Sequence, residues 1–451
     1  MKALLSTLGW LLLLLLTAGP GPRASAADAV KTDDAPAVST GAYIEPVERL
    51  VVEALACNSE LAAARAKSQA AHEGIESAAA LDDPMMEIGV VNAPLNSRSF
   101  RREDMTMKML GFSQKLPFPG KRSLRRAVAT AQADGAELAV LEVTNQLARD
   151  VRVAYEDLVF NLDARRVLAR TAATLQQLVA ITDSRHHLGQ AAQSDVIDAQ
   201  TELGRLRVSQ LQLEREGEVL QSQLRRLLGR LRTDTAIEVG EPALRPAVGA
   251  ESELHTEALE GRPQLRALQV AVERSAKVLE LAQREYYPDF DVRLSYGQRE
   301  PTVDGVPRDD MVSLTFAVNL PIWRKSRLKP QVAEARAMRN EAEAMLRAQQ
   351  LETTTALDEQ IAAAHQWRKS AELYRSTLLP QAQVAVASAL ASYRVGRVDF
   401  LTLRQAEMRE FETATRYAEA IANHNKSLAE IDLLVGESPR KFPTKNPEAS
   451  P

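Results

Sequence analysis

The stretch SQKLPFPGKRSLRRA, Ser113–Ala127, marks a change from an alternating pattern to a helical one. The residues before it, MTMKMLGFSQKL, alternate as a strand does. Pro117 ends that strand because it has no N–H for the ladder, and Pro119–Gly120 forms the turn. Ser123 or a neighbour is then expected to cap a helix that meets no breaker before His187. At 1.5 Å per residue that helix is about 100 Å long, so a strand here leads into a rod.

The same arrangement recurs in the second half of the chain, at AVNLPIWRKSRLKPQ, residues 317–331. GFSQKLPF aligns with TFAVNLPI, so that Pro117 matches Pro321 at a separation of 204 positions. Pro84 and Pro288 match at the same separation. Further along, HHLGQ pairs with YRVGR, and LLG pairs with LVG. Matches in unbroken order indicate a tandem duplication.

Each half is predicted to contain a strand hairpin, a long helix, a turn and a return helix. The first repeat, 43–229, has its hairpin at about 84–117, its long helix at about 123–187 and its return helix at about 191–228. The second repeat, 253–436, has these elements at about 288–321, 327–395 and 398–434. Residues 230–252 form the segment between the repeats, 27–42 an N-terminal linker and 437–451 a tail. Pro330 lies in the first turn of the second long helix, where a missing N–H costs little.

The predicted strands are apolar on one face and polar on the other. In the second repeat Val312, Leu314, Phe316 and Val318 share one face. Transmembrane barrels require strands of this kind, but a water-facing sheet packed on a core shows the same alternation. We favour the barrel because nothing else in the sequence is shaped to cover such a sheet. Since four strands cannot close in lipid, the chain must assemble, and three copies would give twelve strands, an even number within the range of known barrels.

The predicted fold is therefore mixed α/β and mostly α. Duplicated strand–strand–long helix–helix halves form a trimeric twelve-stranded β-barrel in a membrane, which continues as an α-helical coiled-coil barrel across an aqueous gap. Leu147, Val151, Ala154 and Leu158 have the 4-3-4 spacing of a coiled-coil seam.

The N-terminus has the features of a secretory signal peptide. Lys2 precedes an apolar run, Leu4–Thr17, and the small residues Ala24–Ala27 follow, so residues 1–26 are expected to be removed. An uncleaved anchor is the alternative. Cys57, the single cysteine, lies too far along for a lipid anchor and is interpreted as a buried or semi-buried thiol. The balance of 56 basic and 60 acidic residues argues against nucleic acid as a partner.

Two glycine turns complete the pattern: HLGQAAQSDVIDAQ, His187–Gln200, and YRVGRVDFLTLRQA, Tyr393–Ala406. Together with the duplicated halves and SQKLPFPGK, they resemble the TolC-like outer-membrane efflux channel family, the outer membrane factors. FSQKLPFPGK is most similar to the branch paired with heavy-metal resistance-nodulation-division pumps. The resemblance covers nearly the whole mature chain.

The resemblance implies a homotrimeric channel in outer-membrane lipid, with a helical tube in the periplasm and a gate at the glycine tips. It implies a periplasmic adaptor (a membrane fusion protein) and an inner-membrane resistance-nodulation-division pump as partners, no cofactor, and metal cations as the exported substrate. A channel for drug efflux or type I secretion shares the fold and differs in its partners. A soluble periplasmic coiled-coil scaffold is the third alternative.

The same resemblance implies the site residues. The adaptor-docking tips are Leu188, Gly189, Gln190, Ser194, Val395 and Gly396. The gate and latch residues are Asp195, Tyr393, Arg397, Asp399, Thr402 and Gln405. The barrel–helix junction comprises Pro117, Pro119, Gly120 and Pro321. Tyr393 is expected to bond to Asp195. Relatives carry acidic residues where this chain has Thr402 and Gln405, so a mixed-charge ring of Arg397, Asp399 and Arg404 is expected to replace them.

Two further groups invite a metal-binding interpretation. Met85, Met86, Met105, Met107 and Met109 cluster on the first hairpin. Alternation directs all of them except Met86 to the lumen, and thioethers are soft ligands for copper(I) or silver. We interpret them instead as residues that fill gaps, and the pair His186–His187 as helix-end polarity. No catalytic constellation is present, so an enzyme is not expected.

Overall fold

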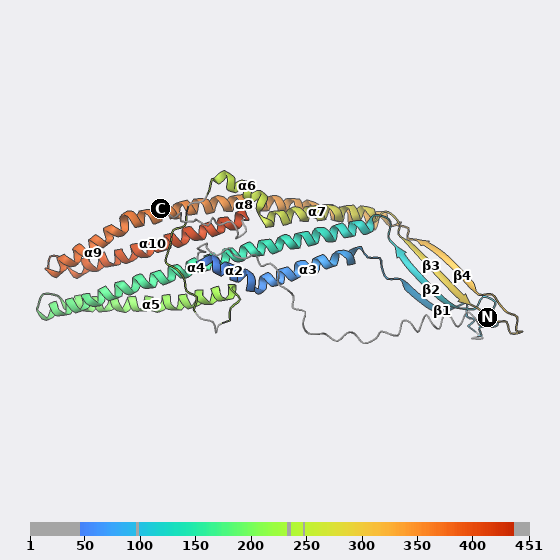
Figure 1. Ribbon diagram of the computed structural model, residues 1–451, viewed down its shortest axis with the longest axis horizontal. Coiled ribbons are helices and arrows are strands. Elements are labelled where there is room, and N and C mark those ends of the chain that lie inside the picture. The colour runs from blue at the N-terminus through green and yellow to red at the C-terminus, as the bar shows by residue number, and fades with distance from the viewer. Residues whose placement is uncertain (1–45, 96–98, 232–235, 247–248, 437–451) are drawn as a thin grey trace, which may run out of the picture. The chain divides into compact units, whose positions relative to one another are not determined.

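The computed structural model describes residues 46–95, 99–231, 236–246 and 249–436 (Figure 1). The predicted signal peptide, linker and tail lie outside these residues. In each half, a strand hairpin leads into a long helical segment, then a glycine turn, then a return helix. The expected class, mostly helical with a small antiparallel sheet, is confirmed.

The four strands form one antiparallel sheet in the order β1-β2-β3-β4. They are β1 (Met85–Val91), β2 (Met107–Leu116), β3 (Phe290–Gln298) and β4 (Met311–Val318). Phe112 lies opposite Leu294, which lies opposite Leu314. Because side chains alternate along each strand, these pairs form an apolar face across the sheet, which Lys108 and Gln114 of β2 interrupt. β1 and β4 remain as edges within the described chain.

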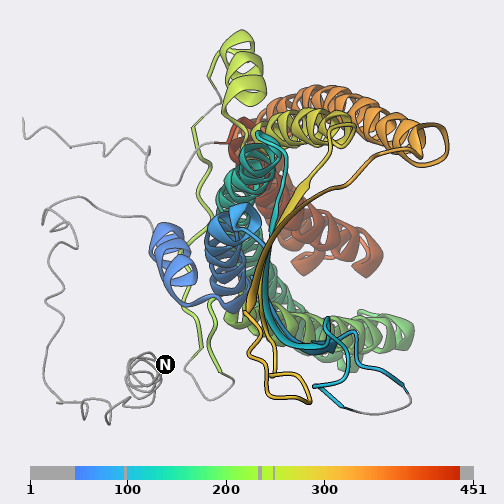
Figure 2. The same ribbon diagram turned by 90° about the vertical axis from the view of Figure 1, so that its right-hand side faces the viewer.

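The helices of the first half are α2 (Pro46–Cys57), α3 (Ser59–Ala79), α4 (Lys121–His187) and α5 (Gln193–Leu227). Asn58 caps α3, because its side-chain oxygen accepts the N–H groups of Glu60 at 2.8 Å and Leu61 at 3.1 Å. α4 has 67 residues. Figure 2 shows α3 and α7 (Pro263–Arg284) on either side of α4, and both pack against it.

The second half contains α6 (Glu251–Gly261), α8 (Lys329–Leu373), α9 (Leu379–Arg394) and α10 (Phe400–Val435). Its long helical segment is interrupted, contrary to the unbroken helix predicted for 327–395. A π-helical turn, Tyr374–Leu378, separates α8 from α9. Pro380 is the second residue of α9, and a proline removes one helical hydrogen bond and crowds the carbonyl four residues earlier, which here belongs to the π turn. A second π turn, Arg324–Leu328, precedes α8.

Of the clusters of buried side chains in the described residues, the two largest join several helices each. The first joins α2, α4 and α5 and contains Leu147, Val151, Ala154 and Leu158, which confirms the predicted seam. The second lies near the glycine turns and includes Leu168, Leu175, Tyr393 and Leu403. The second cluster brings α4, α5, α9 and α10 into one core.

Three local expectations were wrong. Gly120, in the left-handed region at φ 92°, begins α4 without a side-chain cap, and Ser123 Oγ donates to the Gly120 carbonyl at 2.9 Å. Cys57, the last residue of α2, is exposed rather than buried. Met105 lies before β2, so the strand register does not direct it to either face.

Candidate functional site

The two glycine turns have the same local geometry. Gly189 and Gly396 both take positive φ, 71° and 74°. In each turn, the N–H of the residue after the glycine bonds to the carbonyl five residues earlier, at 2.8 Å and 2.9 Å. This is a Schellman-type helix end, and it requires a residue that tolerates the left-handed conformation. The turn chemistry therefore repeats along with the sequence.

Most of the predicted tip residues are accessible in the chain as described. Leu188 is 69% exposed and Val395 is 68% exposed. Gln190 and Ser194 are exposed as well. Two apolar side chains at the end of otherwise polar turns are available for a partner, but docking of an adaptor on them stays a prediction.

Tyr393 joins the two tips through Thr182 rather than through Asp195, the expected partner. Its side chain is 2% exposed, and its hydroxyl lies 2.8 Å from the hydroxyl of Thr182 on α4. The expected bond to Asp195 is therefore wrong. Asp195 lies in the first turn of α5, where a negative charge suits the positive end of the helix. The Tyr393 ring also meets Phe400 edge-on, with centroids 6.2 Å apart.

Arg185 makes the second connection between the tips. Its guanidinium donates to the backbone carbonyl of Tyr393 on the second tip and to that of Gln190 on the first, the latter at 3.3 Å. It also lies 4.7 Å from the centre of the Tyr393 ring, in a cation–π arrangement. Sequence reasoning missed Arg185. The one feature of the sequence that could have indicated its role is its position four residues before the turn glycine, Gly189.

Two of the three residues expected to form a mixed-charge ring, Asp399 and Arg404, have partners within the chain. Asp399 caps α10 by accepting from the Thr402 N–H at 2.9 Å and from the Thr402 hydroxyl at 2.5 Å. These bonds hold the pKa of Asp399 below its ordinary value. Arg404 lies 3.4 Å from Glu202 on α5. Arg397 and Gln405 are exposed. The charge ring across subunits stays a prediction.

A carboxyl group lies inside the apolar cluster behind the tips. Glu407 is 7% exposed, and Leu403 and Phe411 lie one turn away on either side. Among the described residues, its Oε1 has no hydrogen-bond partner. Burial, reinforced by the nearby Glu410, raises the pKa of Glu407 to about 7.

This carboxyl predicts a pH-dependent stability. With an ordinary pKa of 4.5 in the unfolded chain and about 7 in the folded one, the unfolded state loses its proton first as pH rises. The protein should therefore lose thermal stability between about pH 4.5 and pH 7, and Glu407→Gln should flatten that decline. Melting temperatures across this range test it, with the exposed Glu412→Gln as control. Equal slopes in wild type and Glu407→Gln would contradict the assignment.

The predicted junction is built around a buried lysine. Lys121 is 1% exposed, and its ammonium lies 2.9 Å from Asp289, 3.1 Å from Glu285 and 3.1 Å from the Tyr287 carbonyl. Burial alone would raise the pKa of Asp289, but hydrogen bonds from Lys121 and from the Phe118 N–H outweigh it and lower that pKa. The end of the first hairpin is thereby tied to the start of the second.

The other junction residues have the expected positions. Pro117 directly follows β2, and Pro321 lies three residues past β4. Pro119 and Gly120 form the turn into α4. The Phe118 ring stacks on Tyr287 with centroids 4.7 Å apart, which adds an apolar contact to the ion pairs.

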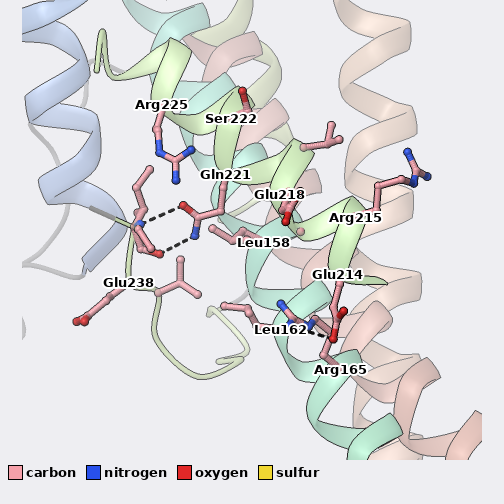
Figure 3. A pocket seen from close by; sticks show the side chains of 15 residues that line it. Leu158, Leu162, Arg165, Glu214, Arg215, Glu218, Gln221, Ser222, Arg225 and Glu238 are labelled. Carbon is pink, nitrogen blue, oxygen red and sulfur yellow. Dashed lines mark hydrogen bonds and ion pairs between the residues drawn. The ribbon is translucent and has the colours of Figure 1, made fainter. Parts of the chain in front are cut away.

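A cavity of about 1140 Å³ lies between α4, α5 and residues 236–239 (Figure 3). Gln221 fastens this segment to α5 by two bonds to the Ile237 backbone, at 2.9 Å and 3.0 Å. Arg165 and Glu214 face each other at 3.9 Å. Charges of both signs line the cavity, and no cluster of metal-ligating side chains occurs in the described part of the chain. We assign no ligand to it.

The histidine and methionine candidates do not converge on a metal site in the described residues. His186 Nδ1 lies 3.1 Å from the Ala191 carbonyl, and His187 lies 3.7 Å from Asp183. Met107 and Met109 share the face of the sheet opposite the apolar one. Met107 covers Gly297, because a Cβ there would come within 2.3 Å of its sulfur. None of the described helices is long and apolar enough to span a membrane.

Comparison with known proteins agrees with this architecture. The outer membrane protein VceC of Vibrio cholerae has a TM-score of 0.74 and 18% identity over 86% of this chain and 96% of that chain. The CmeC outer membrane channel of Campylobacter jejuni has a TM-score of 0.72 and 13% identity over 92% of this chain and 93% of that chain. CusC has a TM-score of 0.73 and 15% identity over 93% of this chain and 100% of that chain. A search of curated proteins finds no match.

At these identities the solved structures show the fold alone. The sequence profile described as outer membrane efflux protein, however, matches residues 50–230 and 254–437, which include both repeats. Members of this family are transport channels rather than enzymes. The chain belongs to the outer membrane efflux protein family.

Proposed function

We propose that the protein is the outer-membrane channel of a tripartite efflux system, delivering to the exterior a substrate received from an inner-membrane pump through a periplasmic adaptor. One observation carries the proposal. A sheet with a largely apolar face and two edge strands leads into two long helical segments, one of them the 67-residue α4 of about 100 Å, which end in two matching, exposed turns. Such a sheet can lie in lipid once several copies close it into a barrel, because no strand edge is then left unpaired. Helices of this length with polar surfaces can cross an aqueous gap.

The channel assembles as a homotrimer with its barrel in outer-membrane lipid. The exported substrate we propose is metal cations. The support is FSQKLPFPGK, which is similar to the branch paired with heavy-metal resistance-nodulation-division pumps. Selectivity belongs to the pump in this scheme, because the described chain offers no metal-ligand cluster.

Two experiments test this function. A deletion strain is grown with copper, silver, zinc, cobalt, cadmium and a drug panel, with and without the gene restored. Sensitivity confined to metals supports the proposal, and sensitivity confined to drugs favours the drug-efflux alternative. Membranes are also washed with salt and alkali before detergent. Release without detergent would exclude the channel and favour the soluble scaffold.

A conductance measurement tests the connection between the tips. Tyr393→Phe removes the bond to Thr182, a neutral hydrogen bond worth about 0.5–1.5 kcal/mol, so the open fraction in a planar bilayer should rise up to about tenfold. Asp195→Ala is the matched control, and we expect no change. If Asp195→Ala opens the channel and Tyr393→Phe does not, the Thr182 pairing is not the closed-state contact.

A further inference from the structure

The buried lysine at the first junction has a counterpart that makes no ion pair with the described residues. The repeat places Lys325 at the position of Lys121, 204 residues later. Lys121 is enclosed by Asp289 and Glu285, as described above. Lys325 is exposed, and in the described residues no carboxylate lies within ion-pair distance of it. Its neighbours Arg324 and Arg327 are exposed too. A basic group therefore occupies the end of the second hairpin with no acidic residue against it.

The complementary acids lie at the other edge of the sheet. The segment that binds Lys121, residues 285–289, corresponds to residues 81–85 in the first repeat. That segment contains Asp82 and Asp83, which are exposed just before Pro84. Within the described chain, neither aspartate has an ion pair. Glu285 and Asp289 correspond to positions 81 and 85, so Asp82 and Asp83 are displaced from the first of these by one and two positions. A lysine side chain is long enough to span this displacement.

The strand edges give an independent check on this pairing. In the chain, Phe112 of β2 lies opposite Leu294 of β3, and Gln114 lies opposite Val292. By the repeat, β4 corresponds to β2 (204 residues later) and β1 corresponds to β3 (204 residues earlier). The same register between β4 and β1 of another copy would place Phe316 opposite Val90, and Val318 opposite Ile88. All four side chains belong to the apolar face. A slip of one residue would turn one strand's apolar face to the wrong side.

We propose that Lys325 is the intersubunit counterpart of Lys121, held by Asp82 and Asp83 of the partner subunit where β4 meets β1 of the next copy. The site is incomplete in one chain, and a second copy completes it. Opposite charges at the base of the sheet select the register before the strands close, as complementary charges do at other interfaces. The inference rests on the proposed function, because it requires the trimer.

Carbodiimide cross-linking tests the contact, because it joins a lysine to a carboxylate only where the two already touch. In detergent-purified protein, we expect covalent dimers and trimers on a denaturing gel, with peptides linking Lys325 to Asp82 or Asp83. Lys325→Gln, or Asp82→Asn with Asp83→Asn, should abolish these species. The Lys121–Glu285 link within one chain is the internal control and should persist in every variant.

A charge exchange supplies the second arm. Lys325→Glu should destabilise the trimer towards heat, and Asp82→Lys with Asp83→Lys should restore its stability. If mass measurement shows a trimer and the Lys121 cross-link forms but the Lys325 cross-link does not, the Lys325 contact is overturned and the proposed channel function still stands. A monomer by mass would overturn the proposed function and the contact together.

Discussion

Replacing Lys121 with methionine is expected to lower the free energy of unfolding by about 3 kcal/mol, because it leaves two carboxylates near a buried position without their cation. Methionine keeps much of the apolar stem, so the loss reports on the charge. The figure is at the lower end for buried pairs because Asp289 and Glu285 are both 32% exposed. The effect should spread to both hairpins, since Lys121 connects one to the other.

Denaturant unfolding of the detergent-purified protein, followed by circular dichroism, measures this loss. Lys115→Met is the matched control, because Lys115 is an exposed lysine of the adjoining strand. We expect the control to stay within about 0.5 kcal/mol of wild type, as surface substitutions usually do. If the Lys121→Met protein is as stable as the control, the buried ion pairs make no net contribution to the free energy of unfolding.

Arg185→Ala should produce the largest opening of the closed channel. It removes one charge-assisted hydrogen bond and a cation–π contact between the two tips, and a second charge-assisted bond, to Gln190, within the first tip. A hydrogen bond of this kind contributes about 1.5–3 kcal/mol, so loss of the bond to Tyr393 alone should shift the open fraction by about tenfold or more. The effect should be large because, among the described residues, Arg185 alone bonds through its side chain to the backbone of both turns.

Single-channel conductance in planar bilayers measures the open fraction. Arg394→Ala is the control, because Arg394 is an exposed arginine at the end of α9. Arg185→Lys keeps the charge but not the fork of donors and should recover only part of the closed state. If both alanine variants behave as wild type, the closed state is held by contacts between subunits instead.

The strands and the rods were predictable because each depends on neighbours in sequence. Alternation along Val312–Val318 follows from the pleat of a strand, whatever lies beyond it. The length of α4 follows from the lack of breakers after Gly120. Pro380 shows the limit of this reasoning, because whether a proline ends, kinks or loosens a helix depends on the packing around it.

The connections between the tips were not predictable in the same way. Thr182 and Tyr393 are 211 residues apart, and neither carries a local pattern that names the other. The resemblance offered Asp195 as the partner, and the packing of α4 against α9 selected Thr182. Arg185 stands in an ordinary run of polar residues, so its role becomes visible only when both turns are placed together.

The amino-acid sequence by itself determined the duplication, the two-faced strands, the long helices and the glycine turns, since these follow from spacing along the chain. The tertiary structure alone decided which charges are buried and which remain exposed. Lys121 and Lys325 occupy equivalent places in two similar basic runs, and no local rule separates them. One is enclosed because residues 285–289 fold against it, whereas the corresponding acids for the other lie at the opposite edge of the sheet. Burial depends on contacts between distant segments, which only the folded chain supplies.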